Sequence, residues 1–324
     1  MLLLRWNPDC HFWSSTLPLD EVFKDIQLSD CDRIIGMKIF CSCDGLFLIG
    51  IWFEPYVVQP SILVIWNPST KESIAIPHSK CPLQMDDDDD GYYDGPDDVG
   101  SAYGFAYDSI NDDYKVFRID MYAGYEILSL KNGSWRIMDE TSAVGTANWM
   151  LAGWECLAFV HGAFHWIGIL SRKFCIVSFN ISYEMFGEIQ LPEILCSQIH
   201  IESVVDVDVG VSLLGGMLGV YYKNDKAFDL WLMKNYSAKD SWMKLFTISS
   251  IGVYSIIPKY MFSNYKVLLC FCFDGETKRY VYRTISGGPS GRIWPLDYVD
   301  DGAATIEWDD FVYTESLISP KLGH

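Results

Sequence analysis

A strand–turn–strand pattern recurs along the chain and limits the folds that it can adopt. Five copies join an apolar run to a second apolar-leaning run through a turn-forming stretch, at residues 62–77, 125–139, 174–192, 228–248 and 279–296. Each copy follows another hairpin, at residues 39–52, 103–119, 156–169, 211–223 and 257–272. Period-two alternation bounded by turn residues is typical of β-hairpins. The sequence therefore predicts an all-β fold that contains five antiparallel units of four strands each.

Repeated four-stranded units of this kind favour a β-propeller. The stretch LLLRWNPDCHFW at residues 2–13 shares its Trp-Asn-Pro phrase with residues 66–68, but no hairpin precedes it. We expect residues 2–17 to pair with strands in the range 304–318, because such closure removes the two exposed edges of an open array. The expected architecture is about six four-stranded blades, closed by N- and C-terminal strands, with five and seven blades as alternatives.

The charge balance argues against two classes of partner. The 324 residues carry a formal net charge of −19, whereas sequence-independent nucleic-acid binding and docking on anionic membranes both need a basic surface. The apolar N-terminal run before Arg5 is too short for a signal sequence. The ten cysteines are therefore expected to be reduced thiols in a cytoplasmic or nuclear protein.

Several phrases resemble a known family, the plant F-box-associated interaction domain of F-box/kelch-like and S-locus F-box-like proteins. The matching stretches include CDGLFLI (43–49), ILVIWNPSTKE (62–72), YGFAYDSINDDYKVFRI (103–119), VHGAFHWIG (160–168) and YTESLISP (313–320). The resemblance implies one kelch-like propeller domain over residues 1–320. It also implies a non-enzymatic role, the capture of target proteins for a Skp–cullin–F-box ubiquitin ligase.

The chain departs from the family pattern at its beginning, where the F-box should precede the first Trp-Asn-Pro phrase. The Leu-Pro-acidic stretch TLPLDEVFKDIQL (16–28) lacks the second half of that motif and follows the phrase. We therefore expect no F-box in this sequence, and Skp adaptor and cullin as partners only if an upstream F-box is present. The alternative is a stand-alone protein-interaction propeller with no link to ubiquitination.

Residue clusters that could carry chemistry have structural interpretations. The acidic run 86–98 places aspartates at the spacing of a calcium-binding loop, but it lacks the final glutamate and the flanking helices of such a loop. We therefore expect a mobile acidic loop, and the alternative is a loop that binds calcium. The pairs Cys41/Cys43 and Cys270/Cys272 are expected to be core residues. His161 and His165 lack the glutamate of a zinc-protease motif, and His165 is expected to be packed. No cofactor, metal or catalytic residue is predicted.

The location of a partner-binding surface follows from the expected topology. Turns inside the hairpins are short, and Asn132-Gly133 is the dipeptide favoured in two-residue turns. The long connections 79–100, 140–155, 193–212 and 250–264 are expected at the opposite ends of the strands, and such loops commonly carry recognition. Aromatic residues anchor many interfaces, so we predict that a target protein contacts these residues of the long loops: Tyr92, Tyr93, Trp149 and Trp154.

Overall fold

The computed structural model describes most of the chain, and contacts divide the chain into two compact units. The described residues are 2–5, 22, 26, 34, 36–54, 59–77, 79, 101–120, 124–138, 157–170, 173–199, 208–262, 266–273, 276–283, 289–292, 310–313 and 315–321. Unit 1 comprises Met1–Ala143, Trp154–Cys156 and Trp308–His324, and unit 2 comprises Val144–Gly153 and Leu157–Glu307.

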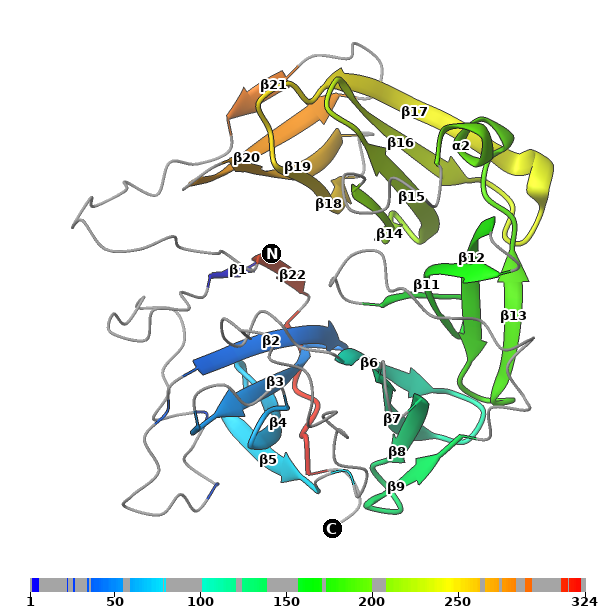
Figure 1. Ribbon diagram of the computed structural model, residues 1–324. Helices are drawn as coiled ribbons and strands as arrows, with labels where there is room; N and C mark the ends of the chain where they lie inside the picture. The colour runs from blue at the N-terminus through cyan, green and yellow to red at the C-terminus, as the bar shows by residue number, and fades with distance from the viewer. Residues whose placement is uncertain are drawn as a thin grey trace, which may run out of the picture. The chain divides into compact units, whose positions relative to one another are not determined.

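Unit 1 contains two four-stranded antiparallel sheets whose strands pair in chain order (Figure 1). The first sheet consists of β2 (Gly36–Cys43), β3 (Leu46–Trp52), β4 (Ile62–Asn67) and β5 (Glu72–Ile76). The second consists of β6 (Ser101–Asp108), β7 (Asp113–Asp120), β8 (Gly124–Ser129) and β9 (Ser134–Ile137). Their facing side chains form one buried cluster, in which Phe40 contacts Tyr103 with ring centroids 4.3 Å apart.

Unit 2 contains three further sheets with the same chain-order pairing (Figure 1). The first has β10 (Ala158–Val160), β11 (Ala163–Leu170), β12 (Lys173–Asn180) and β13 (Met185–Ile189), and the second has β14 (Asp208–Leu214), β15 (Met217–Lys223), β16 (Ala227–Met233) and β17 (Trp242–Ser249). The third has β18 (Ser255–Phe262), β19 (Lys266–Phe273), β20 (Glu276–Arg283) and β21 (Pro289–Arg292). Two buried clusters lie between successive sheets of the unit. The ten predicted hairpins are therefore confirmed as strand pairs.

The last residue of several strands is a short polar residue that closes the following turn. Asn67, from the second Trp-Asn-Pro phrase, is fully buried, and its Oδ1 accepts hydrogen bonds from the backbone N–H of Ser69 at 2.8 Å and of Thr70 at 3.4 Å. Asp108 and Asn180 hold the turns after β6 and β12 in the same way. Asn and Asp favour this geometry because their side chains imitate a backbone carbonyl.

The terminal strands pair with each other in unit 1. Leu2–Arg5 (β1) runs antiparallel to Asp310–Tyr313 (β22), with Leu2 opposite Tyr313. The predicted pairing of the two ends is thus confirmed for these residues. Among the described residues this sheet has two strands, so the structure has five four-stranded sheets and does not reach the expected count of about six.

The C-terminal strap, residues 315–321, lies against the turn that Asn67 closes. Asn67 Nδ2 donates hydrogen bonds to the carbonyl oxygens of Ser316 at 3.1 Å and Ile318 at 2.6 Å. Ser316 Oγ donates to the carbonyl oxygen of Asp44. Ile318 packs against the buried cluster of unit 1. One amide side chain therefore holds both its own turn and a segment about 250 residues away in sequence.

In each unit, one tryptophan connects two neighbouring sheets. Trp135 at β9 donates its indole N–H to the carbonyl oxygen of Pro77, 2.6 Å away and just beyond β5. Trp242 at the start of β17 makes the same bond to Gln190, 2.9 Å away and just beyond β13. Trp135 and Trp242 are therefore packing residues that join one sheet to the next. Trp66 instead packs beside Phe47 within its own sheet.

The hairpin turn at Asn132-Gly133 differs from the prediction. The pairing of β8 with β9 stops at Ser129 opposite Ser134, so the turn has four residues and not two. The backbone N–H of Leu130 donates to the carbonyl oxygen of Tyr114, and that of Lys131 donates to Asp113 Oδ1. These partners on β7 divert the chain before the favoured dipeptide is reached.

Two predicted connections are shorter than expected. The range 193–212 contains the helix α2 (Glu193–Gln198) and the beginning of β14, and the range 250–264 contains the whole of β18. Period-two alternation in 255–262 continues the sheet, because these residues pair with β19. Within the described part of the chain, no helix has the length and apolar character needed to cross a membrane.

Candidate protein-binding surface

The residues predicted to anchor a partner, Tyr92, Tyr93, Trp149 and Trp154, lie outside the described residues. The acidic run 86–98 also lies outside them. The structure does describe Ser79 and Ser101, which stand at the two roots of the connection that carries this run. The geometry of these roots shows how unit 1 holds the connection at its ends.

A buried ion pair holds both roots. Arg118 on β7 and Glu126 on β8 are each 1% exposed, and Arg118 Nη1 lies 2.7 Å from Glu126 Oε2. Ser79 Oγ contacts both carboxylate oxygens of Glu126, at 2.6 and 2.7 Å, and Arg118 Nε donates to Ser101 Oγ at 3.3 Å. Burying two charges is costly unless they are paired and hydrogen-bonded. The serines supply those bonds, so the ion pair and the loop roots stabilise one another.

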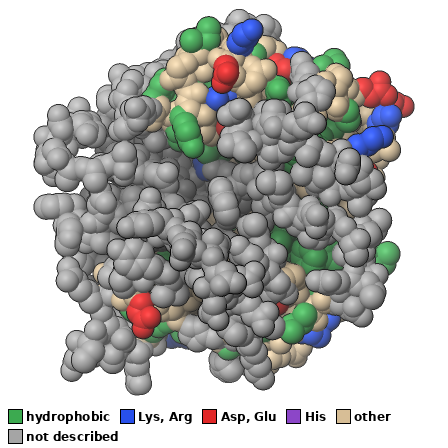
Figure 2. All heavy atoms as spheres, viewed as in Figure 1, with side chains coloured by type: hydrophobic (Ala, Val, Ile, Leu, Met, Phe, Trp, Pro, Cys, Tyr) green, Lys and Arg blue, Asp and Glu red, His purple; other side chains and the backbone are tan. Residues whose placement is uncertain are grey.

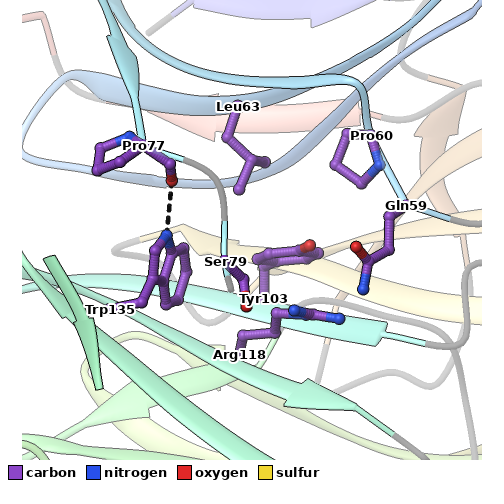
Figure 3. A pocket seen from close by; sticks show the side chains of 8 residues that line it. All are labelled: Gln59, Pro60, Leu63, Pro77, Ser79, Tyr103, Arg118 and Trp135. Atoms are coloured by element: carbon purple, nitrogen blue, oxygen red, sulfur yellow. Dashed lines mark hydrogen bonds between the residues drawn. The ribbon is translucent and has the colours of Figure 1, made fainter. Parts of the chain in front are cut away.

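A small cavity lies beside this ion pair (Figure 3). In Figure 3 the side chains of Gln59 and Arg118 point toward one another beside the Tyr103 ring, and the Trp135–Pro77 hydrogen bond closes one side. Its volume of about 20 Å³ suits about one water molecule, whereas sites for small-molecule ligands span several hundred Å³. The cavity is therefore a packing feature and not a substrate pocket.

Of the two histidines His161 and His165, the second is packed in the core, as predicted. His165 is fully buried, with Nδ1 3.1 Å from the carbonyl oxygen of Ala158 and Nε2 2.8 Å from the hydroxyl of Tyr236. Burial lowers the pKa of His165 to about 4. His161 is exposed, and its ring lies 4.8 Å from that of Tyr236. No group of three or more metal-ligating side chains occurs among the described residues.

The cysteine pairs belong to the sheets, as predicted. Cys41 and Cys270 are buried, and Cys43 and Cys272 are half-buried. Cys41 and Cys43 pack in the buried cluster of unit 1. Burial, together with the neighbouring Asp44, raises the pKa of the Cys43 thiol to about 12. A thiol in that environment stays protonated and is a poor nucleophile.

The described loop end of the β14–β17 sheet presents two exposed apolar side chains that sequence reasoning missed. Ile251 and Tyr254, just after β17, are 75% and 82% exposed. The chain between them is fixed, because the N–H of Val253 donates to Ser250 O and Gly252 has a φ of +74°. Glycine takes this conformation without the steric cost that other residues pay.

Neighbouring segments pin the same turn. The Ser250 N–H donates to the carbonyl oxygen of Lys226, and Ser250 Oγ donates to that of Asn224. The Tyr254 N–H donates to the carbonyl oxygen of Cys272. The connections after β15 and β17 therefore meet at one end of the sheet, as the topology predicts. Ile251 and Tyr254 form what we call the loop-end pair, and its only sequence signal is an apolar residue on each side of a Gly-Val turn.

The opposite end of this sheet carries charged residues on the segment between β16 and β17. Lys239 lies on the 3-10 turn 239–241, and its Nζ is 3.1 Å from Glu193 on α2. Figure 2 shows acidic and basic side chains together at this edge of the described surface. The contact between α2 and this segment means that the two kinds of connection are not fully separated, which corrects the strict division of faces expected from topology.

Comparisons with known proteins match the chain to one family. The model of the F-box associated beta propeller domain matches residues 9–320. In Arabidopsis thaliana, the F-box protein CPR1 is 27% identical over 78% of this chain and 65% of its own length. An F-box/kelch-repeat protein is 24% identical over 87% of this chain and 72% of its own length. The chain thus spans about two thirds of these relatives.

The family match covers nearly all of the described strands. It confirms the predicted fold class as an all-β propeller and confirms the resemblance to plant F-box-associated domains. Among solved structures, a lectin in complex with alpha methyl fucoside aligns over 81% of this chain and 81% of its own, with a TM-score of 0.43 and 10% identity. With its five four-stranded sheets and its match over residues 9–320, the chain belongs to the family of F-box associated beta propeller domains.

Proposed function

We propose that this domain is the substrate-recognition module of a Skp–cullin–F-box ubiquitin ligase and that it binds target proteins and has no catalytic activity. The family match over residues 9–320 carries the proposal. The relatives named above are F-box proteins, and the described residues supply a rigid scaffold of short turns and sheets. A scaffold of this kind suits recognition, because its loops can vary without loss of the core.

The proposed binding surface is, in each unit taken by itself, the end of the sheets where the long connections emerge, called the loop side. Tyr92, Tyr93, Trp149 and Trp154 remain proposed contacts there. The loop-end pair supports this side, because large apolar side chains that are fixed before binding lose little conformational entropy in an interface. The Arg118–Glu126 ion pair supports it too, because it fixes both roots of the acidic connection.

The test compares protein capture and protein turnover. The 324-residue chain and its Ile251→Ser/Tyr254→Ser variant are expressed in plant cells, and proteins that only the first captures are identified. Leu317→Ser, which alters an 85% exposed leucine in unit 1, is the matched control. The abundance of the captured proteins is then measured in plants that lack the gene.

We expect capture to fall with the double variant and to persist with Leu317→Ser, and we expect the captured proteins to accumulate in the mutant plants. If the double variant captures the same proteins as the wild-type chain, the loop-end pair is not a contact. Capture without any change in abundance would favour the alternative, a stand-alone interaction propeller.

The adaptor partners depend on an F-box. A pull-down with purified Skp adaptor should give no stoichiometric complex with these 324 residues, and a chain that carries an upstream F-box should bind the adaptor and, through it, cullin. Robust binding by the 324 residues alone would contradict our interpretation of residues 16–28.

Two finer features belong to the same proposal. One is the kelch-like type of the propeller, supported by the family match and by a relative that is an F-box/kelch-repeat protein. The other is a cytoplasmic or nuclear location, supported by the reduced thiols of Cys43 and Cys196, because disulfides are rare in those compartments. Neither nucleic acid nor membrane is among the proposed partners.

A further inference from the structure

Two turns of the structure, one in each unit, are built alike. The turn 67–72 joins β4 to β5 and the turn 180–185 joins β12 to β13, and in each the first residue pairs with the sixth. In both turns the leading asparagine accepts, through Oδ1, the backbone N–H groups two and three positions later. The fifth residue has a positive φ in each, +60° at Lys71 and +54° at Glu184. The two asparagines therefore hold equivalent positions in their sheets.

The neighbouring turn is also the same in the two sheets. Asp44 and Gly45 between β2 and β3 have φ values of +50° and +79°, and His161 and Gly162 between β10 and β11 have +50° and +77°. In unit 2 the Ile181 N–H donates to the carbonyl oxygen of Gly162 at 3.1 Å, so the two turns of that sheet are adjacent. We call the end of the β2–β5 sheet formed by its two turns the Asn67 site, and its equivalent in the β10–β13 sheet the Asn180 site.

The Asn67 site holds the C-terminal strap. Asn67 Nδ2 donates to the carbonyl oxygens of Ser316 and Ile318, which are two residues apart, as suits an extended chain with its period of two. The Ser316 hydroxyl donates to the carbonyl oxygen of Asp44 in the neighbouring turn. Asn67 is fully buried in this arrangement. The site therefore recognises a segment of chain chiefly through its backbone carbonyl oxygens.

The equivalent donor of unit 2 has no such acceptor. Within the part of the chain that the structure describes, the side chain of Asn180 uses Oδ1 in its own turn and Nδ2 has no hydrogen-bond acceptor. Asn180 is only half-buried. Tyr183 and Met185 of the same turn are 67% and 64% exposed. The Asn180 site thus combines an accessible amide donor with exposed apolar side chains.

Both sites also have an apolar contact at the boundary with the next sheet. In unit 1 the strap residue Ile318 packs against the buried cluster that the first two sheets share. In unit 2 the segment between β16 and β17 supplies Tyr236, whose ring lies 4.8 Å from that of His161. The Tyr236 hydroxyl is bonded to the buried His165, and the residue is 36% exposed. An apolar side chain placed there contacts a ring that is fixed before binding, so little entropy is lost.

We propose that the Asn180 site docks an extended segment of a target protein in the way that the Asn67 site holds the strap. Asn180 Nδ2 donates to two backbone carbonyl oxygens of the segment, two residues apart, and an aliphatic side chain of the segment lies against Tyr236. The strap of each copy of the chain is already held by Asn67, so the segment comes from a different protein. The inference rests on the proposed protein-binding function but on a surface other than the loop-end pair.

The test removes the donor and keeps the turn. Asn180→Asp retains an oxygen that accepts the N–H groups of Ser182 and Tyr183, but it replaces the amide NH₂ with a second acceptor. Asn132→Asp, at an exposed asparagine of unit 1, adds the same negative charge elsewhere and is the matched control. Circular dichroism and urea unfolding confirm that each variant is folded.

The ligands are peptides of ten random residues, selected on the wild-type 324-residue chain. Selected peptides are titrated against the wild type, the two aspartate variants and the Ile251→Ser/Tyr254→Ser variant. Each peptide bond is also replaced in turn by an ester, whose carbonyl oxygen is a weaker acceptor, and by an N-methyl amide, which removes the N–H alone. This scan tests the same hydrogen bonds from the peptide side and needs no variant of the protein.

We expect peptides whose affinity falls about 30-fold with Asn180→Asp, since two hydrogen bonds of typical strength are lost. Asn132→Asp and the loop-end variant should bind them normally, and the ester scan should reveal two sensitive carbonyl groups two residues apart. The proposal is wrong if no peptide is selected, if folded Asn180→Asp binds as tightly as the wild type, or if the ester scan lacks that spacing. Peptides lost only with the loop-end variant would also overturn it, while supporting the loop side as the binding surface.

Discussion

Replacing Asn67 with alanine should loosen the turn after β4 and the C-terminal strap together. The side chain makes two kinds of contact, one within its own turn and one with Ser316 and Ile318. Asn180→Ala is the matched control, because Asn180 Oδ1 accepts from the N–H groups of Ser182 and Tyr183 in an equivalent turn.

The expected magnitude follows from the hydrogen bonds lost. A typical protein hydrogen bond contributes about 1 kcal/mol to stability. Asn180→Ala removes two such bonds and should therefore lower the free energy of unfolding by about 2 kcal/mol. Asn67→Ala removes four and should lower it by about 4 kcal/mol, because it also leaves the carbonyl oxygens of Ser316 and Ile318 without their donor.

The assay is urea unfolding followed by tryptophan fluorescence, applied to both variants and to a chain that ends at Thr314. A double-mutant cycle between Asn67→Ala and this truncation isolates the strap contribution, since only contacting groups give non-additive effects. We expect a coupling of about 2 kcal/mol for Asn67→Ala and near zero for Asn180→Ala. Additive effects, or equal losses for the two asparagines, would refute the role of Asn67 as the anchor of the strap.

Three further predictions test the described network. Arg118→Met should lower the free energy of unfolding by about 3–5 kcal/mol, because it leaves the buried Glu126 carboxylate without its partner. The control Lys131→Met removes an exposed ion pair and should lower it by less than about 1 kcal/mol. Equal losses of stability in thermal unfolding would contradict the role of the buried pair. Trp242→Phe should lower stability by about 1 kcal/mol in urea through loss of the bond to Gln190, and an unchanged midpoint would argue against that bond. The pKa of His165 is about 4 in the folded state and 6.5 without burial, so the unfolded state takes up the proton first as the pH falls. Stability should therefore decrease below pH 6.5, by about 2 kcal/mol at pH 5. His165→Gln should flatten this pH dependence, and an unchanged slope would refute the buried, neutral state of His165.

Local patterns in the sequence were sufficient to predict the strands. Alternation and turn residues located all ten hairpins because a strand with one buried face must alternate, and because short turns need residues such as Asp44-Gly45 and Gly215-Gly216. The same reasoning failed at Asn132-Gly133. There, Asp113 and Tyr114 on the neighbouring strand capture the backbone N–H groups before the dipeptide.

The candidate surface was less predictable than the fold. Contacts were predicted in the long connections, and Ile251 and Tyr254 lie in one of these, 250–264, but the two residues were not singled out. Tyr236 was also missed, since nothing near it in sequence marks its bond to His165, 71 residues away. Exposure and fixed orientation depend on neighbours that a local pattern does not identify.

The sequence by itself determined the repeated hairpins, the propeller class and the family, since each depends on the order of apolar and turn residues along the chain. Only the tertiary structure decided what the recurring Trp-Asn-Pro phrase does at Asn67, and which charges hold the roots at Ser79 and Ser101. Those answers depend on hydrogen bonds between residues that are distant in sequence, from 17 positions for Arg118–Ser101 to 251 for Asn67–Ile318. A polar side chain can satisfy its hydrogen-bonding groups locally or at a distance, and the packing of the sheets determines which partner lies within reach.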